Sequence, residues 1–220
     1  MKKLSAIILI TLGLSGLLMT QCTHDDAEMP IEGFPPVERG DDIVSFNDGY
    51  FFDKTHSSVR WQSAYLGTAA LLTGRFNEFE FDLEFDEANP ANIEVTGRVT
   101  LSTVNTGEPG RDQGCLQGTF GVEESDEAVF ISRSVAFDES DPTGYIVTGD
   151  LTFHGVTDEV IMKLTYLGTD LIILRDVPTN VAGFEAQFEI NALTVFGIES
   201  GNIADRVVIN MNGQFKQPQN

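Results

Sequence analysis

The sequence predicts an all-β fold, an antiparallel sheet of eight to ten strands that either closes as a barrel or packs as a sandwich. Apolar and polar residues alternate in most runs between Tyr50 and Phe215, the pattern of strands with one buried and one solvated face. The alternation of strands with helices that would indicate a parallel sheet is absent. Glycine inside a strand often marks a bend or a close approach of a ligand or of backbone. Three such glycines favour the barrel, as corners of its wall: Thr73-Gly74-Arg75, Thr96-Gly97-Arg98 and Thr148-Gly149-Asp150.

Residues 1–21 have the pattern of a secretory signal peptide. Two lysines precede the mostly apolar run Leu4–Met19, which is shorter than the ~20 residues needed to span a bilayer. Cys22 follows at the position where the bacterial lipoprotein signal places its lipidated cysteine, although Gln21 stands where a small residue is usual. We expect an exported, membrane-anchored lipoprotein on the periplasmic side or the cell surface. An ordinary signal or an uncleaved anchor are the alternatives.

Residues 22–48 contain three prolines and many acids and are predicted to tether the anchor to a folded domain at 49–216. Residues 217–220 form a tail. Within the domain, two long alternating runs lie between Phe76 and Val104, and Asn89-Pro90 marks the turn between them. We expect each run to form a strand of about ten residues.

A loop that runs into a short helix is predicted from Thr106 to Leu116, with Gly118 as its stop. A second short helical piece is predicted at Glu199–Ala204. The later strands are predicted at Val129–Phe137, Tyr145–Phe153, Val160–Tyr166, Leu171–Leu174, Phe184–Ile190 and Val207–Phe215. Turns are predicted at Asp141–Gly144, His154-Gly155, Leu167-Gly168 and Val177-Pro178.

The charge balance excludes several partners. The chain has 13 basic and 34 acidic side chains, and removal of residues 1–21 leaves 11 basic against 34, a net charge of −23. Nucleic acid and anionic membrane surfaces need clustered Lys and Arg, so neither is an expected partner. The acids fit a solvated outer face, because no calcium-loop spacing is present.

The sequence offers little for catalysis or metal binding. Two cysteines and three scattered histidines provide neither a disulfide framework nor a zinc site. With Cys22 lipidated, Cys115 is a lone and buried thiol. The nearest catalytic grouping is Asp53, His56 and Ser57, and a hydrolase that uses these three is an alternative function. We predict no enzyme, no cofactor and no metal.

The interior is therefore the main candidate for function. A barrel of about eight strands either fills with side chains or encloses one ligand. Strands of ten to thirteen residues would build walls of roughly 33–43 Å, a length that suits an extended hydrocarbon. A fully packed, dry interior would instead indicate a scaffold or adhesion protein, the third function considered.

Several segments, in order, resemble the YceI-like family across residues 49–216. They are Tyr50-x-x-Asp53-x-x-His56-Ser57-Ser58-Val59-Arg60-Trp61, Leu66-Gly67, Leu72–Asn77, Leu101–Thr106, Arg111-Asp112, Gly149–Thr157 and Phe196-Gly197-Ile198-x-x-x-Asn202-Ile203. The resemblance implies an elongated, lipocalin-like, antiparallel eight-stranded β-barrel with one or two short helices. It also implies an interior that binds a polyisoprenoid or an isoprenoid quinone. Two departures, Tyr65-Leu66-Gly67 and Gln113–Leu116, lie where the family carries other residues.

We therefore predict a carrier or store for a long isoprenoid or a related lipid, with a membrane contact through the anchor. The oligomeric state stays open, a homodimer included. His56, Arg111 and Asp112 are predicted to contact a head group or to make structural hydrogen bonds. The predicted ligand-contacting residues are Trp61, Phe79, Phe81, Leu83, Phe85, Val95, Val99, Leu101, Phe153, Phe184, Phe188 and Met211.

Overall fold

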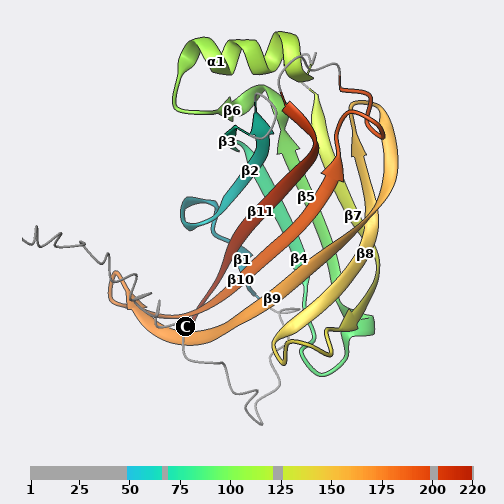
Figure 1. Cartoon of the computed structure of the whole chain (residues 1–220). Helices are drawn as coiled ribbons and strands as arrows, with labels where there is room; N and C mark the ends of the chain where they lie inside the picture. Colours follow the sequence, from blue (N-terminus) through green and yellow to red (C-terminus); the bar gives the residue numbers. More distant parts are fainter. Residues whose placement is uncertain (1–48, 66–68, 121–125, 199–202, 220) are drawn as a thin grey trace, which may run out of the picture. The chain divides into compact units, whose positions relative to one another are not determined.

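In this computed structural model, the described residues (49–219, apart from 66–68, 121–125 and 199–202) form one strongly curled antiparallel sheet and one short α-helix (Figure 1). The strands follow the order β4-β5-β7-β8-β9-β10-β11-β2-β3-β6, and β1 pairs with β11 beside this path. Most neighbours in this order are also neighbours along the chain, as short connections favour. The prediction of an all-β antiparallel fold is confirmed.

The elements have the following bounds. The strands are β1 Phe51–Phe52, β2 Ser58–Tyr65, β3 Ala70–Phe76, β4 Phe79–Glu84, β5 Glu94–Thr100, β6 Val104–Asn105, β7 Glu127–Phe137, β8 Gly144–Phe153, β9 Val156–Leu174, β10 Val177–Asn191 and β11 Ile203–Pro218. The helical elements are α1 Pro109–Gly114, the 3-10 turns η1 Lys54–His56, η2 Pro90–Asn92 and η3 Leu101–Thr103, and the π-helical turn η4 Cys115–Phe120.

The prediction of a closed eight-stranded barrel is wrong. Eleven strands are present in the described residues, and the ladder between them ends at β4 on one side and at β6 on the other. β3 and β4 follow each other along the chain, yet β3 pairs with β6 at Phe76↔Val104 instead of pairing with β4. The two-residue strands β1 and β6 were missed because two residues are too short to show an alternating pattern.

The two strands expected to dominate the fold are shorter than predicted. β4 has six residues and β5 has seven, and the second run ends in the 3-10 turn η3, where Leu101 is buried. The expected turn between the strands is present as η2, which Asn89 caps by accepting a hydrogen bond from the Ala91 amide. The helix near Thr106 also forms, but helical backbone continues past the expected stop at Gly118 to Phe120.

The longest strands lie in the second half of the chain, where two predicted turns are wrong. Leu167-Gly168 lies inside the 19-residue strand β9, where the register with β10 shifts at Gly183/Phe184. A β-bulge accommodates the extra residue without ending the strand. Val177-Pro178 begins β10, and the turn is made by Arg175 and Asp176, which both have positive φ. Of the helical piece expected at Glu199–Ala204, the first four residues lie outside the described residues, and Ile203 begins β11.

The three Thr-Gly sites make room for aromatic rings across the sheet. A Cβ atom at Gly74 would lie 2.6 Å from the Trp61 ring, and one at Gly149 would lie 2.5 Å from the Phe130 ring. At Gly97 the Phe81 ring lies 3.5 Å from the Cβ position, an ordinary contact. The glycines therefore mark close approach, here of side chains on the inner face, since an aromatic ring can cover a glycine on the neighbouring strand.

Candidate ligand-binding site

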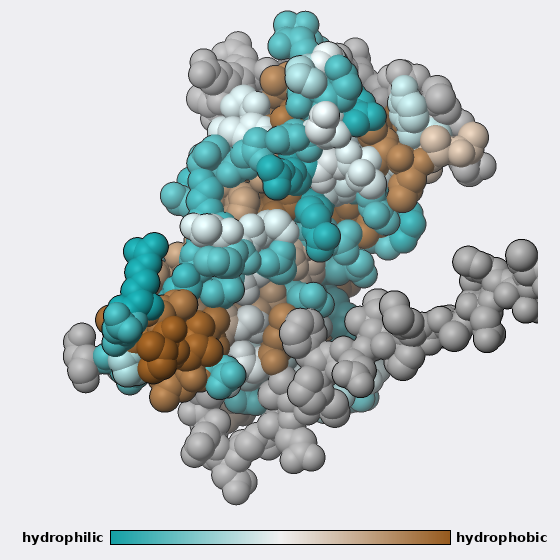
Figure 2. All heavy atoms as spheres, turned by 90° about the vertical axis from the view of Figure 1, so that its left-hand side faces the viewer, coloured by the Kyte–Doolittle hydropathy of each residue, from teal (hydrophilic) through white to brown (hydrophobic). Residues whose placement is uncertain are grey.

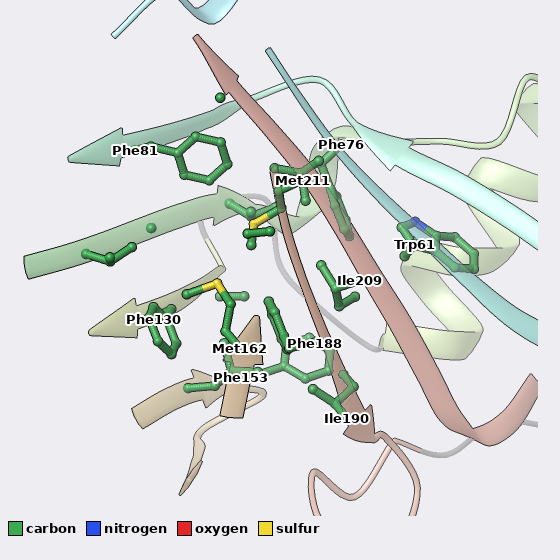
Figure 3. A pocket seen from close by; sticks show the side chains of 18 of the residues that line it. Trp61, Phe76, Phe81, Phe130, Phe153, Met162, Phe188, Ile190, Ile209 and Met211 are labelled. Carbon is green, nitrogen blue, oxygen red and sulfur yellow. The ribbon is translucent and has the colours of Figure 1, made fainter. Parts of the chain in front are cut away.

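The inner faces of the curled sheet surround an apolar cavity of about 140 Å³. Figure 3 shows its side chains converging from several strands, with Phe81 and Phe130 opposite Ile209 and Met211. Only two charged residues border it, Asp82 and Glu185, and both are exposed. Because a cavity with so few polar groups gives water few partners, its favoured occupant is an apolar group.

Most of the residues predicted to contact a ligand border this cavity. Phe79 and Phe85 do not: both are buried elsewhere in the core. Their role as ligand contacts, like that of the others, stays a prediction. The predicted residues at the cavity are Trp61, Phe81, Leu83, Val95, Val99, Leu101, Phe153, Phe184, Phe188 and Met211.

The structure adds cavity residues that the sequence reasoning did not name. Most of them lie at inward positions of strands, where the same parity extended along every strand would find them, whereas Ile198 lies between β10 and β11. Phe130 stacks on Phe188 with ring centroids 6.3 Å apart, and Met162 on β9 is 1% exposed. The additional bordering residues with large apolar side chains are Val59, Phe76, Phe130, Leu151, Met162, Leu164, Ile190, Ile198, Ile203, Val207, Ile209 and Phe215.

An aromatic cluster packs against one part of the cavity wall. Phe85 is fully buried, and its ring centroid lies 4.9 Å from Phe184, 5.0 Å from Tyr166 and 5.6 Å from Tyr145. These tilted and edge-on contacts are favourable geometries for aromatic pairs. Phe184 also borders the cavity, so the cluster fixes one of its walls.

Two of the three predicted head-group residues instead hold the loop before α1. Arg111 donates from Nε to Thr106 Oγ1 (2.9 Å) and from Nη2 to the Thr106 carbonyl oxygen (2.7 Å). Asp112 Oδ1 accepts from the Thr106 amide at 2.7 Å. Neither residue borders the apolar cavity. The geometry favours the structural role that the sequence reasoning considered for them, and contact with a head group stays a prediction.

The grouping of Asp53, His56 and Ser57 forms part of a polar network on β11. Asp53 Oδ2 lies 2.6 Å from His56 Nδ1 and forms an ion pair with Lys216. Ser57 Oγ donates to the Asp53 carbonyl oxygen at 2.8 Å and accepts from the Gln214 amide at 2.9 Å. The only hydroxyl proton of Ser57 is therefore bound to a carbonyl oxygen and not directed at the His56 ring, whereas a nucleophile needs a hydrogen bond to its base.

The ionisation of Asp53 follows from the same contacts. Burial raises the pKa of its carboxyl group, but hydrogen bonds and charge from Lys216 and His56 outweigh this effect and hold the pKa below the ordinary value. Asp53 is 8% exposed, so its charge is compensated inside the protein. This network fastens the start of the domain to β11.

Within the described residues, no group of three or more His, Cys, Asp or Glu side chains is placed to hold a metal ion. The same residues contain no helix with the length and apolar character to cross a bilayer. Cys22 lies outside the described residues, as do the predicted signal peptide and the whole of the predicted tether.

Known proteins share this sequence pattern and fold. The UPF0312 protein of Vibrio campbellii (strain ATCC BAA-1116) is 33% identical over 114 residues, which cover 51% of this chain and 59% of that protein. The match thus spans less than two thirds of the relative. The crystal structure of Burkholderia cenocepacia BcnA aligns with a TM-score of 0.63 at 20% identity, over 74% of this chain and 99% of that one.

A second structure is described as a polyisoprenoid binding domain from Saccharophagus degradans implicated in plant cell wall breakdown. It aligns with a TM-score of 0.54 at 18% identity, over 77% of this chain and 99% of that one. At such identities the two structures show a shared fold. The family model described as YceI-like domain matches residues 50–215, nearly the whole domain predicted from the sequence. The chain belongs to the YceI-like family.

Proposed function

We propose that this protein binds an extended isoprenoid chain, or a closely related lipid, in the cavity of its curled sheet, for carriage or storage. The apolar cavity of about 140 Å³ is the observation that carries the proposal. A packed scaffold would have no such space. The fit to hydrocarbon comes from the lining, and the choice of an isoprenoid rests on the family and on the similar fold described as a polyisoprenoid binding domain.

The mechanism is burial without bond breakage. Each methylene group taken from water into the apolar interior contributes about 0.8 kcal/mol. Burial of about ten methylene equivalents of a bound chain therefore contributes on the order of 8 kcal/mol to the free energy of binding. The entropic cost of immobilising the chain must be subtracted from this figure. Affinity then grows with the enclosed length, and the head group contributes orientation.

We further propose that Cys22 is lipidated and keeps the domain at a membrane on the exported side. The basic start and the apolar run before Cys22 support this proposal. A carrier at a membrane surface can exchange a poorly soluble chain without releasing it into water. Mass spectrometry of the intact mature protein would detect the acyl groups, and an unmodified N-terminus or an intact signal would contradict the proposal.

Mass spectrometry of the lipids that stay bound through gentle purification tests which ligand the protein carries. Uptake of an added prenol can be followed directly, because Trp61 is the only tryptophan of the chain and borders the cavity. We expect its emission to change as the prenol binds. No retained lipid, together with no response of Trp61 to added prenols, would refute the carrier.

A variant that fills the cavity tests whether the ligand binds there. Ala186→Phe places a ring at an inward position of β10 that borders the cavity, and we expect prenol uptake to be lost. Ile161→Phe adds a ring at an outward position of β9 that is 62% exposed and should leave uptake unchanged. Circular dichroism shows whether both variants fold, and Ala186→Leu gives a smaller step if the larger one does not. Equal uptake by all variants would place the ligand elsewhere.

A further inference from the structure

The outer face of the sheet carries two arginines side by side. Arg60 on β2 and Arg75 on β3 are directly opposite in the ladder, so their side chains lie on the same face. Both are exposed, whereas the alternating neighbours Val59, Trp61 and Phe76 are buried. The pair therefore lies on the opposite face of the sheet from the apolar cavity.

These arginines have no carboxylate partner in the described part of the chain. Six of its ten described Lys and Arg side chains form ion pairs with Asp or Glu, and Arg60 and Arg75 form none. This is unexpected in a chain with 34 acids and 13 basic residues. Like charges directly opposite on neighbouring strands are destabilising, so the pair costs stability unless an anion lies between them.

The outward positions next to the pair are all uncharged. They follow from the registers of β11, β2, β3 and β6 and from the period of two along each strand. The positive potential of the pair is therefore not cancelled by an adjacent carboxylate. These positions are Ser58, Gln62, Thr73, Asn77, Asn105, Val208, Asn210 and Asn212.

The two arginines border a groove together with the loop that follows β6. The groove is lined by Arg60, Trp61, Gln62, Thr73, Gly74, Arg75, Asn105, Thr106, Gly107 and Asn210, with no Asp or Glu among them. Arg111 and Asp112, which do not line the groove, hold Thr106 by the hydrogen bonds described above. The wall of the groove is thus fixed before any ligand arrives.

Two asparagines flank the pair and line the groove. Asn105 lies opposite Arg75, and its Oδ1 accepts from the Gly107 amide at 2.9 Å. Because a backbone amide can only donate, Nδ2 is the remaining group of that side chain. Asn210 lies opposite Arg60, and its Oδ1 accepts from Gln187 Nε2 at 2.7 Å. The row Asn210, Arg60, Arg75, Asn105 therefore presents donors from four neighbouring strands.

We propose that this groove is an oxyanion site that binds a phosphate group. Two guanidinium forks and two amide groups supply more donors than a planar carboxylate can accept, and a tetrahedral dianion balances both positive charges. The phosphate can come from a soluble phosphate ester or from a lipid head group. The site is independent of the ligand in the apolar cavity.

Thermal unfolding of the purified protein tests the site, with inorganic phosphate and glycerol 3-phosphate as probes and sodium chloride at matched ionic strength as reference. At phosphate concentrations ten times the dissociation constant, we expect Tm to rise by about 3–6 °C relative to chloride. Arg60→Gln and Arg75→Gln should each abolish this rise. Arg98→Gln, which removes an exposed arginine paired with Glu127, should keep it.

Further measurements separate the two sources of phosphate and the two sites. Co-sedimentation with vesicles that contain phosphatidic acid, a lipid with a phosphomonoester head group, but not with phosphatidylcholine vesicles, would assign the phosphate to a lipid if it depends on Arg60 and Arg75. A response to glycerol 3-phosphate without co-sedimentation would assign it to a soluble ester. Without phosphate, Arg75→Gln should unfold at or above the wild-type Tm, and its prenol uptake should be normal. A phosphate-dependent rise that survives in both variants, or no rise in the wild type, would overturn the proposal.

Discussion

Replacement of Gly149 by alanine tests the packing that shapes the cavity. A Cβ atom there would lie 2.5 Å from the backbone oxygen of Ile131 and 2.5 Å from Cζ of Phe130. The backbone oxygen is held in the β7–β8 ladder and cannot move aside as a flexible side chain would. The Phe130 ring would have to shift against Phe188, which it stacks on at 6.3 Å.

The magnitude follows from two opposing effects. Overpacking a well-filled interior costs about 1–3 kcal/mol, and the lower entropy of the unfolded chain with alanine returns about 0.4–1 kcal/mol. We expect the free energy of unfolding to fall by about 1–2 kcal/mol, a fall in Tm of roughly 2–8 °C for a domain of this size. Urea unfolding followed by circular dichroism measures it.

Gly97→Ala is the matched control, because Gly97 also follows a threonine inside a strand and faces an aromatic ring. Its Cβ would meet the Phe81 ring at 3.5 Å, an ordinary contact. We expect its free energy of unfolding to stay level or to rise by less than about 1 kcal/mol. Equal losses in Gly97→Ala and Gly149→Ala, or no loss in the latter, would refute the account of these glycines.

Two further predictions concern titratable groups. Asp53→Asn should lower the free energy of unfolding by about 2–3 kcal/mol at neutral pH, because Lys216 loses its partner while only partly exposed. The folded pKa of Asp53 is depressed, so its contribution to stability is present above the unfolded-state pKa near 4 and is lost as the pH falls through the folded pKa. Between pH 2 and 6, the free energy of unfolding should therefore rise less steeply with pH in the variant than in the wild type. Equal slopes in the two proteins would contradict this. Burial, and secondarily the charge of Asp112, raise the pKa of the Cys115 thiol, which is 4% exposed. In a Cys22→Ser protein, Ellman's reagent should react with it more than about tenfold faster in urea than in the native state, and rapid native reaction would show that the thiol is accessible.

Part of the exposed apolar surface gathers at a place that the alternating pattern did not single out. Figure 2 shows apolar surface gathered over the tip of the β9–β10 hairpin, where Leu171, Ile173 and Val177 are 57%, 66% and 42% exposed. The alternating pattern predicts Leu171–Leu174 as a strand with one buried face. These side chains belong to the end of a long hairpin, where neighbouring strands no longer cover both faces.

Local periodicity by itself determined most of the longer strands and their inward faces. The alternation of Phe81 and Leu83 with acids requires only the geometry of one strand, so it predicts that these residues face inward whatever the sheet does next. The same holds for Phe184 and Phe188 on β10. The family pattern, carried by Gly149–Thr157 and the other quoted segments, was also readable without coordinates.

The tertiary structure decided closure, register and the space inside. Whether β3 pairs with β4 or β6 depends on the curl of the whole sheet, and a two-residue strand leaves no periodic trace. The bulge opposite Gly183 kept β9 continuous where the sequence indicated a turn. Parity cannot distinguish a cavity residue such as Phe81 from a packed one such as Phe85, because that difference depends on how side chains from distant strands fit together.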